Sequence, residues 1–278
     1  MNKNFIINLK RKMLKNNIYK NQYSPELLQK ISRKKNRILL KSNNSFSYGE
    51  DIWNLYEISW LQKNGFPQIA IGEIIVPFDT EYFIESKSLK LYLNSLNQTF
   101  FDNESDVSKV IQSDLTHCIL HDIKVTLFPI SYFSSKKINF FEGECLDDYN
   151  INIKNFEYNT NDLLNATEPV KIKNKTLFTN LFKANCPITN QPDWGSVQII
   201  YSGNRIKKKN IIKYLFSFRK HREYHEQCAE IIFDDIKHFC KPNELFIYLR
   251  FVRRGGIDIN IWRGTRSFAP INSRLARQ

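Results

Sequence analysis

The stretch LFIYLRFVRRGGIDINIW, residues 245–262, decides the fold class of this chain. Two apolar segments, 245–251 and 257–262, flank a short polar connection that ends in two glycines. Gly255 and Gly256 can adopt the positive φ that tight turns need, so this pattern predicts a β-hairpin. An antiparallel pair of strands is therefore expected in this part of the chain.

Hydrophobic periodicity places further elements on both sides of the hairpin. Residues 224–239 carry an apolar stripe at helical spacing, formed by Cys228, Ile231, Ile232, Ile236 and Phe239. Helices are also expected over 85–96, 105–120 and 211–218, and extended segments over 51–60, 68–77, 123–132, 151–158 and 195–201. Each half then has the order strand–strand–helix–helix–strand–strand. This order predicts an α+β fold with antiparallel sheets and helices packed on one face.

The chain divides into three parts by composition. Residues 1–45 are basic and irregular, with Ser24 placed to cap a short helix, and they predict an N-terminal arm. An Asn- and Asp-rich passage near 147–167 predicts the boundary between two modules, 46–150 and 151–278.

The formal net charge is +13, from 41 Lys and Arg against 28 Asp and Glu in 278 residues. Such an excess is typical of proteins that bind nucleic acid, anionic lipid or an anionic small molecule. However, Lys, Asn, Ile and Phe recur throughout, and the basic residues mark no single helix face. We therefore favour compositional drift and expect no direct nucleic-acid partner.

The cysteines and the hydropathy pattern restrict the cellular context. The five cysteines include no CxxC pair, which favours neither a disulfide framework nor a tetrahedral zinc site. No stretch is apolar for long enough to span a bilayer, and the first residues have no sustained apolar core. These features predict a cytoplasmic protein with no membrane partner.

A thiol and a carboxylate share one Pro-punctuated loop, 185–196, directly before an expected strand. Cys186 is a candidate nucleophile, because a thiolate attacks carbon electrophiles well. Asp193 is a candidate proton donor to the group that such an attack creates. The alternative is a structural cysteine, which is common in proteins of a reducing compartment.

Cations near the start of the expected helix 85–96 form a second candidate site. The first N–H groups of a helix and its dipole favour phosphate, and Lys87 and Lys90 share one face. The alternative is an ordinary solvated helix face. Neither GxGxxG nor GxxxxGK[ST] is present, so scattered cations would have to hold any nucleotide.

The pair His225–Glu226 lies on the expected helix 224–239. His221 and His225 are four residues apart, a spacing that can bind zinc, but no third ligand is evident. Alternatively, the Glu226 carboxylate can accept hydrogen bonds from a guanine-type N1–H and exocyclic amine together. Either residue could also be part of a simple helix surface.

Four separated segments together resemble the NADPH-dependent 7-cyano-7-deazaguanine reductase family, the nitrile reductase of queuosine biosynthesis. They are ESKSLKLYLNSLNQT (85–99), NCPITNQPDWGSVQIIYSG (185–203), FRKHREYHEQCAE (218–230) and RRGGIDINIWR (253–263). The resemblance is to the long, two-module type and covers the chain from about residue 51 to its end. It implies two tandem ββααββ tunnelling-fold modules, completed as a barrel by homodimerisation.

The resemblance also implies an activity and the residues that perform it. The implied reaction reduces a deazapurine nitrile to a primary amine by two hydride transfers from NADPH, with no metal. Cys186 matches the nucleophile that forms a covalent thioimide, and Asp193 matches the proton donor. The positions that match substrate-binding residues are Ile84, Glu85, Ser86, His225 and Glu226. Those that match dinucleotide contacts are Ser86, Lys87, Arg254 and Gly255.

Two other classes of function remain open at this point. A related zinc-dependent GTP cyclohydrolase-like enzyme would need cysteine and histidine ligands acting together. A basic RNA-binding module would show steeply salt-dependent binding to RNA.

Overall fold

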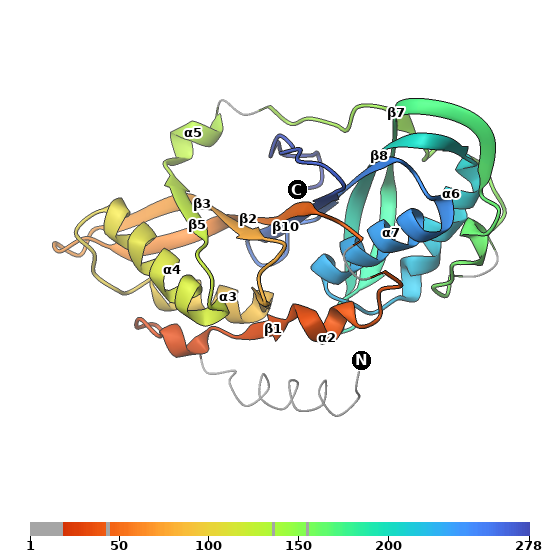
Figure 1. Cartoon of the computed structure of the whole chain (residues 1–278). Coiled ribbons are helices and arrows are strands. Elements are labelled where there is room, and N and C mark those ends of the chain that lie inside the picture. The colour runs from red at the N-terminus through yellow and green to blue at the C-terminus, as the bar shows by residue number, and fades with distance from the viewer. Residues whose placement is uncertain (1–18, 43–44, 135–136, 154–155) are drawn as a thin grey trace. The chain divides into compact units, whose positions relative to one another are not determined.

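The computed structural model describes residues 19–42, 45–134, 137–153 and 156–278 (Figure 1). The chain forms two compact units. Unit 1 comprises residues up to 36, 51–138 and 253–259, and unit 2 comprises 37–50, 139–252 and 260–278. The predicted modules 46–150 and 151–278 are continuous in sequence, whereas these units are not, and the modules stay a prediction.

Unit 1 contains strands β2, β3 and β5 in the order β5-β3-β2, with the first residues of β10 beside β2. The bounds of its elements are η1 Pro25–Leu27, β1 Lys30–Ser32, α2 Arg33–Arg37, β2 Tyr48–Leu61, β3 Pro67–Pro77, β4 Tyr82–Ile84, α3 Ser86–Ser95, α4 Glu104–Ile119, β5 Lys124–Phe128 and α5 Ile130–Ser134. The ends of α2 and β2 extend into unit 2. Figure 1 shows α3 and α4 along the same side of the unit 1 strands.

Unit 2 contains an antiparallel series with the strand order β10-β9-β8-β7, and β6 lies beyond β7. The bounds of its elements are β6 Glu144–Cys145, η2 Asn161–Leu163, β7 Thr167–Asn185, β8 Pro192–Ile206, α6 Lys208–Phe216, η3 Ser217–Lys220, α7 His225–Cys240, β9 Glu244–Phe251 and β10 Ile257–Gly264. The short β6 pairs with β7 in parallel. The helices α6 and α7 lie on one face of these strands (Figure 1).

The predicted α+β class is confirmed, and so are most predicted elements. β9 and β10 pair antiparallel as expected, and Gly255 and Gly256 have φ of 57° and 74°. The α7 stripe is buried at Cys228, Ile232 and Ile236, each 0% exposed. Burial of this stripe against the sheet supplies the hydrophobic free energy that holds the helix in place.

Two sequence-based expectations were wrong, and one strand was missed. The described residues of 151–158 form no strand. The segment 123–132, expected to be extended, is a strand only up to Phe128, where β5 ends, and the chain then turns into α5. β7, which no periodicity indicated, is the longest strand of unit 2. The order strand–strand–helix–helix–strand–strand therefore holds for the second half. Among the described residues of the first half, only the two-residue β6 follows β5 as a strand, and it pairs with β7 of unit 2.

The predicted irregular arm is ordered where the structure describes it. β1 pairs antiparallel with β4, and a buried ion pair of 2.5 Å joins Arg33 to Asp51. Ser24 precedes η1 but makes no side-chain capping hydrogen bond, which corrects the predicted cap. Residues 1–18 of the predicted arm lie outside the described residues.

Candidate active site

Cys186 lies in the tight connection between β7 and β8. These strands pair up to Asn185 and Pro192, so the connection is closed by strand pairing on both sides. The Cys186 N–H donates to the Gln191 carbonyl at 2.9 Å, and its own carbonyl accepts from the Asn190 N–H at 2.9 Å. Asn190 has φ of 61°, a conformation that asparagine tolerates better than most residues. The half-buried thiol is thus held on a defined loop.

Asp193 lies on β8 beside this loop and contacts the first residue of α7. Its side chain is 3% exposed, and its Oδ2 lies 3.4 Å from His225 Nε2. The His225 ring stacks on Phe251 with ring centroids 3.9 Å apart. Phe251 lies on β9 opposite Gly195 of β8, so strand pairing fixes the platform under the imidazole. The fold thereby brings together an acid and an imidazole that lie far apart in sequence.

Glu226 follows His225 in the first turn of α7 and is 3% exposed. A buried carboxylate is costly unless it is hydrogen-bonded, and a helix N-terminus is a favourable place for a negative charge. His221, in contrast, lies before α7, at the C-cap of η3. The proposed zinc pair His221–His225 is therefore not on one helix, which corrects that interpretation.

The segment 221–224 runs beside the Cys186 loop. The Asn185 N–H donates to the His221 carbonyl at 2.8 Å, and Asn185 forms a parallel bridge with Arg222. Burial lowers the pKa of His221 to about 4 and raises the pKa of Glu223 to about 7. Sequence reasoning missed Glu223, although it lies within the quoted segment 218–230. Glu223 lies one residue beyond the bridge between Asn185 and Arg222, a long-range pairing that no local pattern reveals.

In unit 1, Glu85 forms the N-cap of α3. Its carboxylate accepts the N–H groups of Lys87 at 3.1 Å and Ser88 at 2.7 Å. Burial raises the pKa of Glu85, and these two hydrogen bonds oppose that rise. The expectation that the first N–H groups of this helix are open to phosphate is therefore wrong for these two. Ser86 and Lys87 themselves are exposed.

The N-terminal segment of unit 1 fixes the position of this helix start. The Glu85 N–H donates to the Gln29 carbonyl at 2.9 Å, and the Gln29 N–H donates to Ser88 Oγ at 3.0 Å. Ile84, paired with Lys30 in the β1–β4 ladder, is 1% exposed. Ile84 is thus a buried strand residue beneath the helix start.

The turn 253–256, also in unit 1, lies next to α3. A Cβ at Gly255 would lie 4.0 Å from the Lys90 side chain, and one at Gly256 would lie 2.4 Å from Glu57 Cδ. Lys90 forms an ion pair with Glu57 and is only partly exposed, whereas Lys87 is exposed. Arg254 is exposed beside Gly255. Arg254 and Gly255, two of the predicted dinucleotide contacts, therefore lie on a turn beside α3 within unit 1. The other two predicted contacts, Ser86 and Lys87, lie in the first turn of α3.

Two other arginines of the hairpin have structural roles. Arg263, 0% exposed on its side chain, donates to Glu230 at 2.8 Å, and Arg37 reaches the same carboxylate at 2.6 Å. Arg250 donates to the Gln278 side chain at 2.7 Å and is also buried. These guanidinium groups hold unit 2 together and are not open to phosphate.

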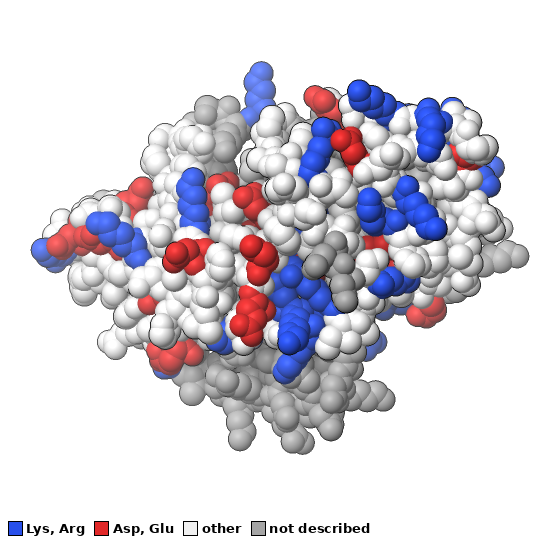
Figure 2. Space-filling view, in the orientation of Figure 1, with Lys and Arg blue, Asp and Glu red and all other residues white. Residues whose placement is uncertain are grey.

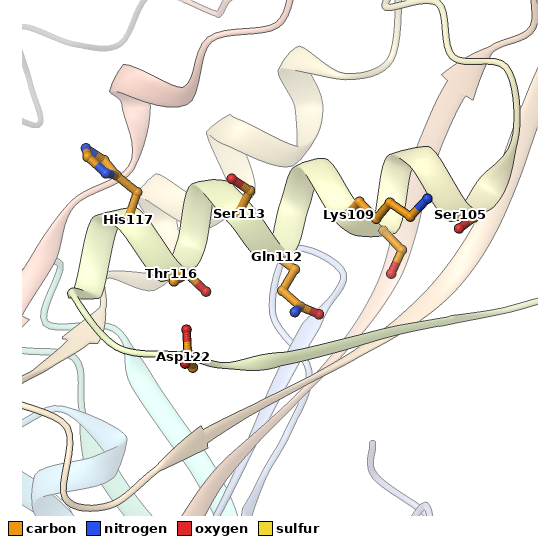
Figure 3. Close-up of a pocket in the computed structure, with 8 residues that line it drawn as sticks. Ser105, Lys109, Gln112, Ser113, Thr116, His117 and Asp122 are labelled. Carbon is orange, nitrogen blue, oxygen red and sulfur yellow. The ribbon is translucent and has the colours of Figure 1, made fainter.

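Other surface features do not coincide with the predicted site residues. A polar pocket of about 540 Å³ lies along α4 in unit 1, and Figure 3 shows its lining side chains. They are Ser105, Ser108, Lys109, Gln112, Ser113, Thr116, His117 and Asp122. On the face shown in Figure 2, Lys and Arg are spread over the surface with Asp and Glu among them.

Within the described parts of the chain, no group of three or more His, Cys, Asp or Glu side chains is arranged to hold a metal ion. None of the helices in these parts is long and apolar enough to cross a membrane.

Comparison with known families matches two parts of the chain. Residues 19–127 match the model described as nitrile reductase, 7-cyano-7-deazaguanine-reductase N-term. Residues 192–269 match the model described as QueF-like protein. Among solved structures, the apo form of the archaeosine synthase QueF-like is similar at 17% identity, with a TM-score of 0.30, over 36% of this chain and 95% of that chain.

Proposed function

Because the chain belongs to the 7-cyano-7-deazaguanine reductase family, the nitrile reductases of queuosine biosynthesis, we propose that it reduces this nitrile to the primary amine with NADPH. The product would be 7-aminomethyl-7-deazaguanine. One observation carries the proposal: Cys186 lies on the hairpin loop whose second strand presents buried Asp193 to His225. A nucleophile, an acid and an imidazole thus come from one compact part of unit 2.

The first step is the addition of the Cys186 sulfur to the nitrile carbon. A free thiol is only a few per cent thiolate at neutral pH, and a nitrile is a weak electrophile, so addition needs concerted proton transfer. Asp193 can deliver a proton to the nitrile nitrogen as sulfur adds, and His225 can exchange that proton with Asp193. The product is a thioimide, in which the substrate is tethered to the protein.

Two buried carboxylates suit the substrate's hydrogen-bond donors. Glu226 in unit 2 can accept from the N1–H and exocyclic amine of a guanine-like ring. Glu85 in unit 1 is 3% exposed and already accepts two backbone N–H groups, which fixes its orientation. We propose substrate contacts for both, and for Ile84, Ser86 and His225.

The residues of unit 1 fit a phosphorylated dinucleotide. NADPH, when bound, supplies the two hydrides of the reaction. Lys87 and Arg254 offer exposed cations, and Arg254 can hold a phosphate with two parallel hydrogen bonds. Gly255, with φ of 57°, lets the backbone come close to a ligand, and the Ser86 hydroxyl can donate a hydrogen bond.

We also propose that the protein works as a homodimer in the cytoplasm, with a small-molecule substrate and without direct contact to nucleic acid.

The experiment that tests the proposed function is NADPH oxidation by purified protein after addition of 7-cyano-7-deazaguanine. The absorbance of NADPH should fall by two equivalents per amine formed, and mass spectrometry should identify the amine. No oxidation with this nitrile would contradict the proposal. Metal analysis separates it from a zinc cyclohydrolase, and salt-dependent RNA binding separates it from an RNA-binding module.

A further inference from the structure

Glu223 is a buried carboxyl to which the proposed reaction assigns no role. It is 6% exposed, and its Oε2 atom has no hydrogen-bond partner among the described residues. Burying a carboxyl without a partner is unfavourable, and such groups concentrate at functional sites. Burial raises its pKa to about 7, so a large fraction of it is a neutral acid near neutral pH.

The backbone places Glu223 close to the nucleophile. Asn185 and Arg222 form a parallel bridge, and Cys186 and Glu223 are the next residues on the two segments. Paired segments lie about 4.8 Å apart at the bridge, so Cys186 and Glu223 follow it on adjacent segments. Glu223 also precedes Tyr224 and the pair His225–Glu226 in sequence, so its backbone joins the loop of the nucleophile to the start of α7.

Other ionisable groups surround Glu223. The buried thiol of Cys228 has its pKa raised by desolvation and also by the charges of Glu223, Asp193 and Glu226. His221 and His225 flank Glu223 in sequence, and Cys186 follows Asn185, the bridge partner of Arg222. Desolvation is the main cause that raises the pKa of Glu223, so a charge on this carboxyl is disfavoured.

The proposed reaction needs protons that Asp193 alone does not supply. At the addition step Asp193 gives a proton to the nitrile nitrogen and regains one from the thiol of Cys186. The addition therefore consumes no net proton. The first hydride and one proton convert the thioimide into a hemithioaminal. The C–S bond must then break, and its electron pair goes to the Cys186 sulfur while the nitrogen lone pair forms a C=N bond.

We propose that Glu223 is the acid that protonates the Cys186 sulfur as the C–S bond breaks. The neutral carboxyl gives its proton to sulfur, which leaves a carboxylate, a free thiol and an iminium ion. The second hydride reduces the iminium ion to the amine, and Glu223 regains a proton from water. This inference rests on the proposed function, because it assigns a residue to a later step of the same site.

The test uses Glu223→Gln in the full chain, followed by intact-protein mass spectrometry and steady-state kinetics. Without NADPH, the variant should form the nitrile adduct as fully as wild type. With NADPH, it should accumulate an adduct heavier by two hydrogens, and kcat should fall about 100-fold, as expected for the loss of a general acid. The kcat of wild type should fall as pH rises through the pKa of about 7 that burial gives Glu223, and this decrease should be absent in the variant.

Matched variants control for folding and for charge. Glu223→Asp keeps the acid and should accumulate no heavier adduct. Glu244→Gln makes the same change at a partly exposed carboxylate of unit 2, paired with Arg266, and should leave kcat unchanged. Near-wild-type turnover of Glu223→Gln, loss of its nitrile adduct, or slow turnover without the heavier adduct would each overturn the inference alone. Failure of wild type to form any adduct would instead refute the proposed function, and the inference with it.

Discussion

The predicted site residues of the two units differ in burial and in chemistry. In unit 2, Asp193 and Glu226 are buried, and Cys186 is half-buried on a loop closed by strand pairing. In unit 1, Ser86, Lys87 and Arg254 are exposed, and only Ile84 and Glu85 are buried. A buried carboxyl can hold or move a proton in a dry environment, whereas an exposed cation attracts a phosphate that stays largely solvated. The difference suggests that unit 2 performs bond making and unit 1 binds the reductant.

The largest effect is expected at the nucleophile. Cys186→Ala should lower kcat by more than about 10,000-fold, because removal of a covalent nucleophile abolishes the route through a tethered intermediate. The thermal unfolding temperature should stay close to that of wild type, since the thiol is only half-buried. Substantial turnover by the folded variant would remove the assigned role of unit 2.

A smaller effect is expected at Glu226. Glu226→Ala should raise the KM for the nitrile substrate by at least about tenfold, because hydrogen bonds to a charged group contribute about 1.5–3 kcal/mol. The KM for NADPH should change little, which separates substrate recognition from cofactor binding. Steady-state kinetics with each of the two substrates varied in turn checks both values. An unchanged substrate affinity would show that Glu226 does not recognise the ring.

The smallest effect is expected at the exposed cations of unit 1. Lys87→Ala and Arg254→Ala should each raise the KM for NADPH about tenfold, or about 1.4 kcal/mol, with kcat nearly unchanged. Both effects should shrink at high salt, because exposed charges are screened. Lys109→Ala, which removes an exposed lysine from α4 of the same unit, is the matched control. An equal effect at Lys109 would mean that only net charge matters.

The sequence predicted those elements whose burial follows a simple period. The α7 stripe and the hairpin 245–262 are examples, since nearly all their apolar positions face the interior. β7 was missed because none of residues 167–176 is buried, and because its register shifts at three places. Residues 151–158 alternate like a strand, yet Tyr158 instead donates a hydrogen bond to Asp235 at 2.7 Å.

The candidate site was also predicted only in part, because its long-range contacts follow no local pattern. Motifs located Cys186, Asp193 and the pair His225–Glu226, but the contact between Asp193 and His225 joins residues from β8 and α7 and needs the fold. The same holds for the proposed role of Glu223, which rests on its burial and on the bridge between Asn185 and Arg222. The motif correctly located Glu85 at the start of a helix. However, Glu85 caps α3 by accepting the N–H groups of Lys87 and Ser88, so these two N–H groups are not open to an anion as expected. The roles of all these residues stay predictions.

The central claim is that the sulfur of Cys186 bonds to the nitrile carbon of the substrate. Intact-protein mass spectrometry tests it most directly, with wild type and Cys186→Ala each incubated with 7-cyano-7-deazaguanine and no NADPH. The account predicts a mass increase equal to one substrate molecule on wild type alone, and its disappearance when NADPH is added. The same adduct on the alanine variant, or none on an active wild-type protein, would contradict it.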